Sequence, residues 1–185
     1  MKKNIVLIGM PGAGKSTLGV ILAKALMMDF VDSDLVIQKE EGRTLSRIIE
    51  EEGTDAFVKT EERINAALEA ENAVIATGGS AVYGKRAMEH LSQIGTVVYL
   101  CISYEQVAER LRSLKERGVV HKDGQTLKDI YNERSGLYEK YADVTVDIDG
   151  LDIARALAKV MEALGRRPAA KAQEACSENR RPAAK

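Results

Sequence analysis

The fold of this chain is decided by residues 5–17, IVLIGMPGAGKST. An apolar run with the character of a strand leads directly into the pattern Gly-x-x-x-x-Gly-Lys-Ser, and a helical pattern follows it. Glycines let the main chain approach an anion closely, and successive N–H groups then form a concave nest for a phosphate. The start of the following helix adds the positive end of its dipole. We therefore predict a loop that binds the phosphates of a nucleotide.

The motif assigns chemistry to individual residues. Lys15 is placed to reach the β- and γ-phosphates of ATP, and the hydroxyl of Ser16 is placed to bind Mg²⁺. The nucleotide-binding residues that we expect in this loop are Gly12, Ala13, Gly14, Lys15, Ser16 and Thr17. A glycine-rich turn without a ligand is the alternative, but the flanking strand and helix favour nucleotide binding. The loop alone does not distinguish a kinase from a GTPase or a motor.

Composition restricts the class of protein. The 185 residues suffice for one α/β domain, and 30% charged with 45% hydrophobic residues is ordinary for a soluble globular protein. The formal net charge of −1 gives no global field that would recruit nucleic acid or a membrane surface. No apolar run is long enough to span a bilayer, and the first residues lead into a strand rather than a signal peptide.

The two cysteines do not suggest a disulfide framework. Cys101 sits in an apolar strand pattern and is expected in the core, whereas Cys176 falls in a polar tail. Both favour a reducing, cytoplasmic location. We expect a monomer that acts on a small molecule, with no nucleic-acid or membrane partner.

Apolar segments alternate with helical patterns along the chain. Strands are expected at residues 4–8, 30–31, 73–77, 96–102 and 142–146. Helices are expected at residues 15–28, 34–41, 44–51, 53–71, 84–92, 103–114, 126–140 and 150–164. Apolar strands that alternate with helices indicate a parallel sheet covered on both faces. In such a sheet, ligands bind beyond the carboxyl ends of the strands.

The periodic pattern stops near Gly165. Residues 166–171, RRPAAK, recur as residues 180–185, and this region has no apolar face. We expect residues 1–164 to form one domain and residues 165–185 to be a disordered tail. A weak contact with an anionic partner is the alternative for the tail.

A set of motifs spread along the chain resembles shikimate kinases. They are residues 9–17, Asp32-Ser33-Asp34, Phe57 with Glu61, Gly78-Gly79, Arg117, and Arg134 with Tyr138 and Ala142-Asp143. The resemblance covers nearly all of residues 4–162. The phosphate loop is shared with many families, whereas Asp-x-Asp combined with Arg-x-x-x-Tyr-x-x-x-Ala-Asp is much more specific.

The resemblance implies a three-layer P-loop kinase fold, in which helices flank a parallel sheet of about five strands and a lid covers the site. It implies transfer of the γ-phosphoryl group of ATP, with Mg²⁺, to a hydroxyl of shikimate. The product would be shikimate 3-phosphate, made in aromatic amino acid biosynthesis.

The resemblance also implies roles for residues at the strand ends. Asp32 would hold the metal through water beside Ser16, and Asp34 would bind substrate hydroxyls and orient the attacking one as a base. The alternative is that Asp32-Ser33-Asp34 is only a helix N-cap, in which Ser33 or Asp34 could also cap. Arg134 would pair with the substrate carboxylate, because a planar guanidinium matches it; an ordinary helix-surface arginine is the alternative.

A charged, glycine-containing loop at about residues 112–124 matches the lid of the family. Arg117 would reach the γ-phosphate and stabilise the transferring charge. Arg110 would stack on adenine, or else be a solvated helix charge. Residues 117–120 read Arg-Gly-Val-Val where the family usually has Arg-Pro-Leu-Leu, which predicts a more flexible lid. Gly118 and Gly124 bracket a segment suited to hinged closure.

Two positions depart from the family pattern. Shikimate kinases usually carry Phe-Arg-x-x-Glu in the substrate-binding helix, but this chain has Val58 in place of the arginine. Either Lys59, which lies about 100° further around the helix, bends in to bind substrate, or Arg134 acts alone, or the substrate is not shikimate. Gly-Gly-Gly becomes Gly78-Gly79-Ser80, which we expect to line the substrate site.

The sequence therefore predicts a small-molecule kinase whose catalytic residues are Lys15, Asp34 and Arg117. Shikimate is the first candidate substrate. One alternative is a related enzyme of the same fold that acts on gluconate, a nucleotide or an amino-acid hydroxyl. The other is a nucleotide-binding regulator without turnover.

Overall fold

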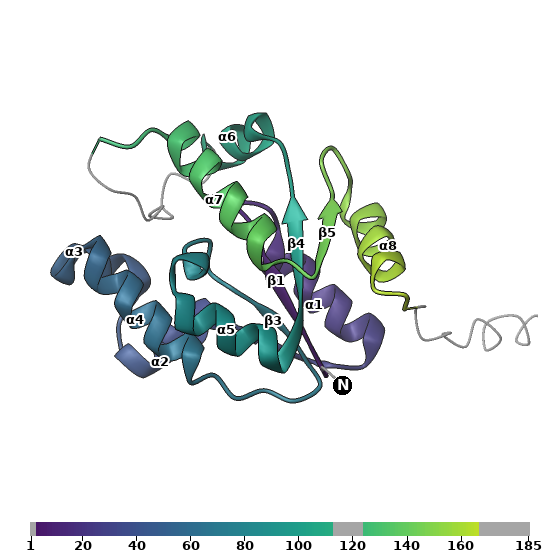
Figure 1. Cartoon of the computed structure of the whole chain (residues 1–185), viewed down its shortest axis with the longest axis horizontal. Helices are drawn as coiled ribbons and strands as arrows, with labels where there is room; N and C mark the ends of the chain where they lie inside the picture. Colours follow the sequence, from purple (N-terminus) through teal and green to yellow (C-terminus); the bar gives the residue numbers. More distant parts are fainter. Residues whose placement is uncertain (1–2, 113–123, 167–185) are drawn as a thin grey trace, which may run out of the picture.

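Five parallel strands form the centre of the molecule (Figure 1). The computed structural model describes residues 3–112 and 124–166. The strands are β1 (Asn4–Ile8), β2 (Asp29–Asp32), β3 (Ala73–Ala76), β4 (Gly95–Cys101) and β5 (Val144–Asp147). Their order across the sheet is β2-β3-β1-β4-β5, and every neighbouring pair is parallel. The predicted α/β class with a five-stranded parallel sheet is confirmed.

Helices cover both faces of this sheet. They are α1 (Lys15–Leu26), α2 (Ser33–Glu41), α3 (Leu45–Glu52), α4 (Thr54–Ala66), α5 (Lys85–Ile94), α6 (Tyr104–Arg112), α7 (Leu127–Tyr141) and α8 (Ile153–Ala163), with a short 3₁₀ helix, η1 (Ala81–Tyr83). Helices α1 and α8 pack together on one face, while α5 and α7 contact β4 on the other (Figure 1). Helix α4 packs against α5 and joins α2 and α3 at one end of the molecule.

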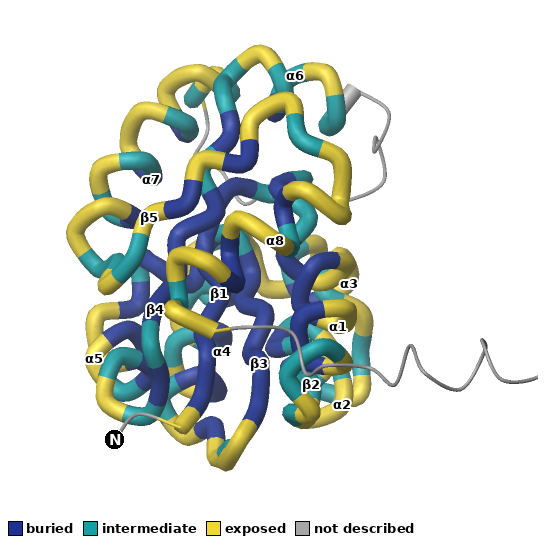
Figure 2. Tube along the Cα trace, turned by 90° about the vertical axis from the view of Figure 1, so that its right-hand side faces the viewer, coloured by how far each residue is buried: buried dark blue, intermediate teal, exposed yellow. Residues whose placement is uncertain are grey.

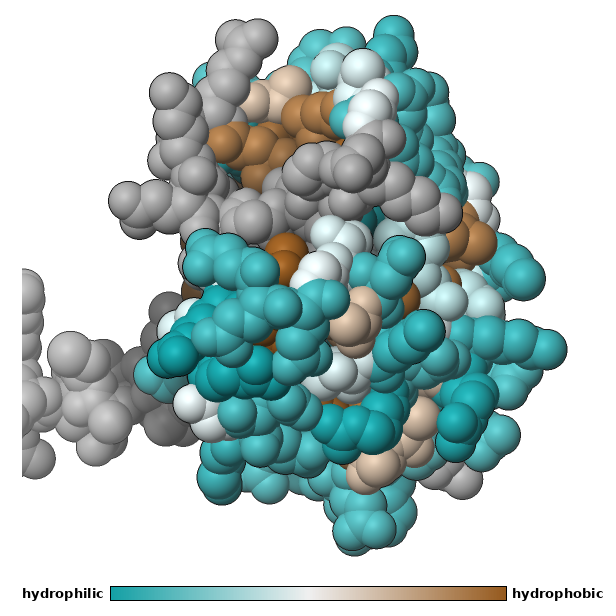
Figure 3. All heavy atoms as spheres, turned by 90° about the vertical axis from the view of Figure 1, so that its left-hand side faces the viewer, coloured by the Kyte–Doolittle hydropathy of each residue, from teal (hydrophilic) through white to brown (hydrophobic). Residues whose placement is uncertain are grey.

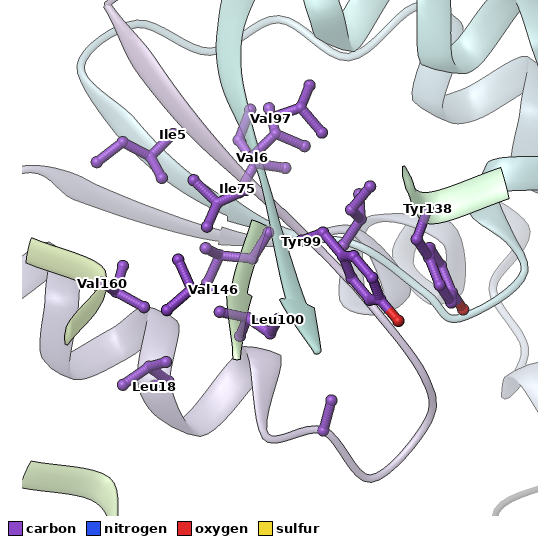
Figure 4. Close-up of a cluster of buried hydrophobic side chains, with 14 of the residues drawn as sticks. Ile5, Val6, Leu18, Ile75, Val97, Tyr99, Leu100, Tyr138, Val146 and Val160 are labelled. Atoms are coloured by element: carbon purple, nitrogen blue, oxygen red, sulfur yellow. The ribbon is translucent and has the colours of Figure 1, made fainter. Parts of the chain in front are cut away.

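The core lies where the apolar strands meet these helices (Figure 2). All five residues of β1 are buried, as expected for a strand covered on both faces. Val146 and Val160 pack from β5 and α8 on one side (Figure 4). On the other side the ring of Tyr99 stacks on Tyr138 of α7 with centroids 5.1 Å apart.

A second, smaller cluster of buried apolar residues joins α2, α3 and α4. Its members are Ile37, Ile48, Phe57 and Ile64. Figure 3 shows the side of the molecule that carries α3 and α4, and hydrophilic side chains cover most of its lower half. The three helices therefore have their own apolar contact beneath a polar outer surface, next to the carboxyl ends of the strands.

Most element boundaries differ by one or more residues from those predicted, and two of these differences have a clear physical reason. The helix expected at 53–71 ends at Ala66, yet Leu68 is still buried, so the apolar periodicity runs on after the backbone leaves the helix. The last strand begins at Val144 rather than residue 142, because Asp143 contacts β4 partly through its side chain, which accepts from Val97 N–H at 2.9 Å. The short helix η1 was not predicted, since three residues give no periodic signal.

Several predictions fall outside the described residues. They are Arg117, Gly118 and most of the lid at 112–124, and the tail from residue 167 onward, with Cys176. In the part of the chain that the structure describes, none of the helices combines the length and the apolar character needed to cross a membrane.

Candidate active site

The phosphate loop joins β1 to α1 with the backbone that its glycines predict. Gly9, Gly12 and Gly14 have φ angles of 146°, 80° and 89°, which L side chains rarely adopt. A Cβ on Gly9 would lie 2.7 Å from the carbonyl oxygen of Leu100, so the loop also passes close to β4. Gly14 directly precedes α1, whose first N–H groups therefore face the loop.

Lys15 is buried at the start of α1, with 8% of its surface exposed. Its Nζ donates to the carbonyl oxygens of Gly9 and Met10, at 2.7 and 3.0 Å. Burial lowers the pKa of Lys15 to about 8, and the nearby carboxylate of Asp34 raises it in part. The ammonium is thus held across the loop, at the place where phosphate oxygens would supply a stronger partner.

Ser16 and Thr17 are exposed in the first turn of α1, as a ligand-facing position requires. Asp32 ends β2, and its Oδ1 accepts from the N–H of Asp34 at 3.0 Å. Asp32 is therefore the N-cap of α2, so the segment does cap a helix, as the alternative interpretation expected. Ser33 instead accepts from the N–H of Gly78 at 3.3 Å and ties the end of β2 to that of β3.

The segment that follows β3 lies against the phosphate loop. A Cβ on Gly79 would lie 2.7 Å from the ring of Pro11, so only glycine permits this approach. The hydroxyl of Tyr138 donates to the carbonyl oxygen of Gly79 at 2.6 Å. Ser80 in the same segment is also buried, with 4% exposed, and the substrate-binding role of Gly78, Gly79 and Ser80 stays a prediction.

Arg134 of α7 is one of the most deeply buried side chains, with 1% exposed. Its Nε donates to the hydroxyl of Tyr83 at 3.2 Å, and its guanidinium lies 5.1 Å from the centre of that ring. The alternative of a helix-surface arginine is excluded. A buried cation that helps set the pKa of Lys15 is an appropriate partner for an anionic ligand.

Glu61 of α4, which the sequence analysis named as part of the Phe57–Glu61 motif without giving it a role, lies among the site residues. It is 1% exposed, and an added Cβ on Gly78 would lie 2.3 Å from its Oε1 and 2.8 Å from Oδ1 of Asp34. Both carboxylates therefore adjoin the same point beside Gly78. The available signal was the spacing of Phe57, Glu61 and Ile64, which puts an acidic residue on an apolar helix face.

Two predicted ligand-binding residues have different outcomes. Arg110 of α6 is half-buried and donates to the carbonyl oxygen of Gly12 at 3.0 Å, so it contacts the phosphate loop. Lys59 is exposed on α4, about 200° around the helix from Glu61, so the structure does not bring it to the buried charges.

The buried charges influence one another across the site. The pKa of Lys15 responds to Asp34, Arg134, Asp32 and Glu61. Within residues 3–112 and 124–166, no group of three or more His, Cys, Asp or Glu side chains could hold a metal ion.

Comparisons with known proteins agree on one family. The family model described as "Shikimate kinase" matches residues 11–165. The chain is 44% identical over 152 residues to the shikimate kinase of Pasteurella multocida, which covers 80% of this chain and 87% of that protein. It is 38% identical over 167 residues to the shikimate kinase of Vibrio cholerae, with 87% and 96% covered.

Solved structures show the same similarity. The shikimate kinase from Acinetobacter baumannii in complex with shikimate has a TM-score of 0.79 and 32% identity, over 88% of this chain and 92% of that one. The shikimate kinase from Aquifex aeolicus has a TM-score of 0.74 and 31% identity, over 88% and 96%.

Proposed function

The chain belongs to the shikimate kinase family, and from this premise we propose how its own residues phosphorylate shikimate. It is a phosphotransferase with an alcohol acceptor and uses ATP in aromatic amino acid biosynthesis. The observation that carries the proposal is the convergence of Lys15, Asp34 and the buried Arg134 at the ends of parallel strands.

The phosphate loop fits the triphosphate of ATP. Gly12 and Gly14 supply positive φ angles, and the backbone N–H groups at the start of α1 supply donors. Lys15 exchanges its two carbonyl partners for the β- and γ-phosphate oxygens, and Arg110 contacts the nucleotide side of the loop. Arg117, outside the described residues, supplies further positive charge at the γ-phosphate.

The exposed hydroxyl of Ser16 and the carboxylate of Asp32 are hard oxygen donors, which fit Mg²⁺. Ser16 would bind the ion directly and Asp32 would hold it through water. Bound there, Mg²⁺ supplies neutralisation of the charge that develops on the phosphate oxygens.

The acceptor lies between β2, the segment after β3, and α7. Arg134 pairs with its carboxylate, and Asp34 orients the attacking hydroxyl and takes its proton. Gly78, Gly79 and Ser80 form the floor of this site. Lys59 is not part of this proposal, because its helix position directs it away from Glu61 and Gly78.

We also propose a monomer, testable by light scattering, and a cytoplasmic location, testable by fractionation.

A coupled assay of ADP release with shikimate tests the assignment. Asp34→Asn should lower kcat by about two to four orders of magnitude while the affinity for ATP is largely retained, because the base is lost and the phosphate loop is intact. If Asp34→Asn instead abolished ATP binding and left kcat normal, the assignment of Asp34 as the base would be wrong.

A further inference from the structure

Glu61 carries a buried carboxylate to which no positively charged group of the described residues donates a hydrogen bond. Among the described residues, neither Oε1 nor Oε2 has a hydrogen-bond partner, and the residue is 1% exposed. Burial raises the pKa of Glu61 to about 7, with Asp34 adding to the rise and Ser80 opposing it. A buried carboxylate without a partner is costly, so a ligand that supplies a positive donor would be bound strongly.

This carboxylate lies in the acceptor site rather than elsewhere in the core. Its Oε1 and the Oδ1 of Asp34 are both within 2.8 Å of one point beside the Cα of Gly78. The two cations whose charges act on Glu61 have other hydrogen bonds: Lys15 to carbonyl oxygens of its own loop, and Arg134 to Tyr83.

Val58 explains why the protein provides no positively charged partner for the carboxylate of Glu61. It precedes Glu61 by three residues on α4, so both point to the same side of the helix. An arginine at this position, as in the family motif, would carry a guanidinium to the carboxylate. Val58 instead packs against the apolar cluster of α2–α4 and has no donor to offer.

We propose that this site also phosphorylates a hydroxy amino acid, whose ammonium group lies between Glu61 and Asp34. The inference rests on the proposed function, since it keeps Arg134 as the partner of the carboxylate and Asp34 as the base. The α-ammonium group of an amino acid is adjacent to its carboxylate, so it occupies the region where an arginine at position 58 would join Glu61 to that carboxylate.

L-homoserine matches the known acceptor in one further respect. Its γ-hydroxyl is separated from its carboxylate by the same number of bonds as the 3-hydroxyl of shikimate. In the transfer, the hydroxyl oxygen forms a bond to the γ-phosphorus while the bond from that phosphorus to the β–γ bridging oxygen breaks. ADP leaves, and the hydroxyl proton passes to Asp34.

The test compares acceptors that differ only in the ammonium group. Steady-state kinetics with Mg·ATP are measured for L-homoserine and 4-hydroxybutyrate, for L-serine and 3-hydroxypropionate, and for shikimate, with the phosphate ester confirmed by ³¹P NMR. We expect kcat/KM for L-homoserine to exceed that for 4-hydroxybutyrate at least about 30-fold, the size of a charged hydrogen bond. Equal rates for the members of each pair, or no phosphorylation of either amino acid, would overturn the inference.

Variants connect the preference to Glu61. Glu61→Gln should remove the difference in kcat/KM between L-homoserine and 4-hydroxybutyrate, whereas Glu69→Gln, an exposed change of the same charge, should preserve that difference. Val58→Arg should lower kcat/KM for L-homoserine about tenfold or more and improve the use of shikimate. An equal loss on all acceptors in Glu61→Gln would mean that Glu61 only supports the fold, and would refute the inference.

The two proposals can fail separately. If Asp34→Asn leaves shikimate phosphorylation unchanged, the proposed function fails, whatever the amino acids show. If wild-type protein phosphorylates shikimate and Asp34→Asn does not, but L-homoserine gains nothing from its ammonium group, only the further inference fails.

Discussion

The buried ammonium group of Lys15 donates hydrogen bonds to two backbone carbonyl groups, and burial lowers its pKa. Lys15→Ala should lower kcat by about three orders of magnitude or more, because the side chain contacts the transferring phosphate. The fold should be kept, and the melting temperature should not fall, because a desolvated ammonium is removed. Assay and thermal unfolding beside the exposed Lys24→Ala check this; near-normal turnover in Lys15→Ala would refute the assignment.

Glu61 should make the stability of the protein depend on pH. Its pKa rises from 4.5 to about 7 on burial, so the folded protein holds a proton that the unfolded chain releases. The free energy of unfolding should therefore fall as pH rises from 4.5 to 7 and stay low above 7. The free energy of unfolding of Glu61→Gln should equal that of the wild type near pH 4 and exceed it by about 3 kcal/mol at pH 8.

Urea unfolding of the apo protein at pH 4, 6 and 8 measures this difference, with Glu69→Gln as the control on an exposed residue. A Glu61→Gln advantage that does not change with pH would contradict a buried, proton-binding carboxylate.

Sequence reasoning was most successful for residues whose position follows from backbone continuity. Lys15 and Ser16 follow a strand and a glycine pattern, and Asp34 follows the end of another strand, so topology brings them to one edge. The burial of Glu61 beside Asp34 could not be predicted in this way. It depends on Gly78 and Ser80, which are distant in sequence and pack against α4 only in the fold.

At the scale of elements, α7 positions the segment after β3 through one hydroxyl. Tyr138→Phe keeps the ring that stacks on Tyr99 but removes the donor to the carbonyl oxygen of Gly79. We expect a loss of about 1–2 kcal/mol in the free energy of unfolding, because a buried carbonyl loses its partner. KM for the acceptor should also rise, since Gly79 adjoins the acceptor site.

Chemical unfolding and acceptor kinetics test this prediction, with the half-buried Tyr141→Phe of the same helix as the control. Unchanged values of both quantities in Tyr138→Phe would show that packing alone holds the segment.

Element boundaries were predicted less well than element types, and the reasons are local. Asn72 adopts a positive φ of 51° at the turn into β3, and the chain leaves α4 well before it while Leu68 remains buried. The apolar periodicity indicates which residues are buried, not which backbone groups are hydrogen-bonded in a helix. The predicted helix was therefore extended to residue 71. Thr126 with Asp129 forms a capping box at the start of α7, and this start was predicted closely.

Across the whole molecule, alternation of strands and helices predicted a parallel sheet but did not by itself define the strand order. The order β2-β3-β1-β4-β5 places β1 between β3 and β4, strands that come much later in the chain. That placement brings the phosphate loop between Gly79 on one side and Leu100 on the other. Such long-range pairing depends on side-chain packing that a local pattern does not encode.

We expect the folded domain to end just after α8, because of the way this helix packs. Ala156, Val160 and Met161 belong to the main core, and Arg166 donates its N–H to the carbonyl oxygen of Met161 at 2.9 Å, after Gly165 has turned the chain. Deletion of residues 167–185 should therefore leave the melting temperature within about 2 °C of that of the full chain, and kcat/KM within about twofold.

Deletion from Ile153 onward, which removes α8, should abolish cooperative unfolding, because α1 and β5 lose their apolar cover. Circular dichroism melts and the kinase assay on both shortened chains measure these effects. A drop of many degrees after the first deletion would instead make residues 167–185 part of the folded domain.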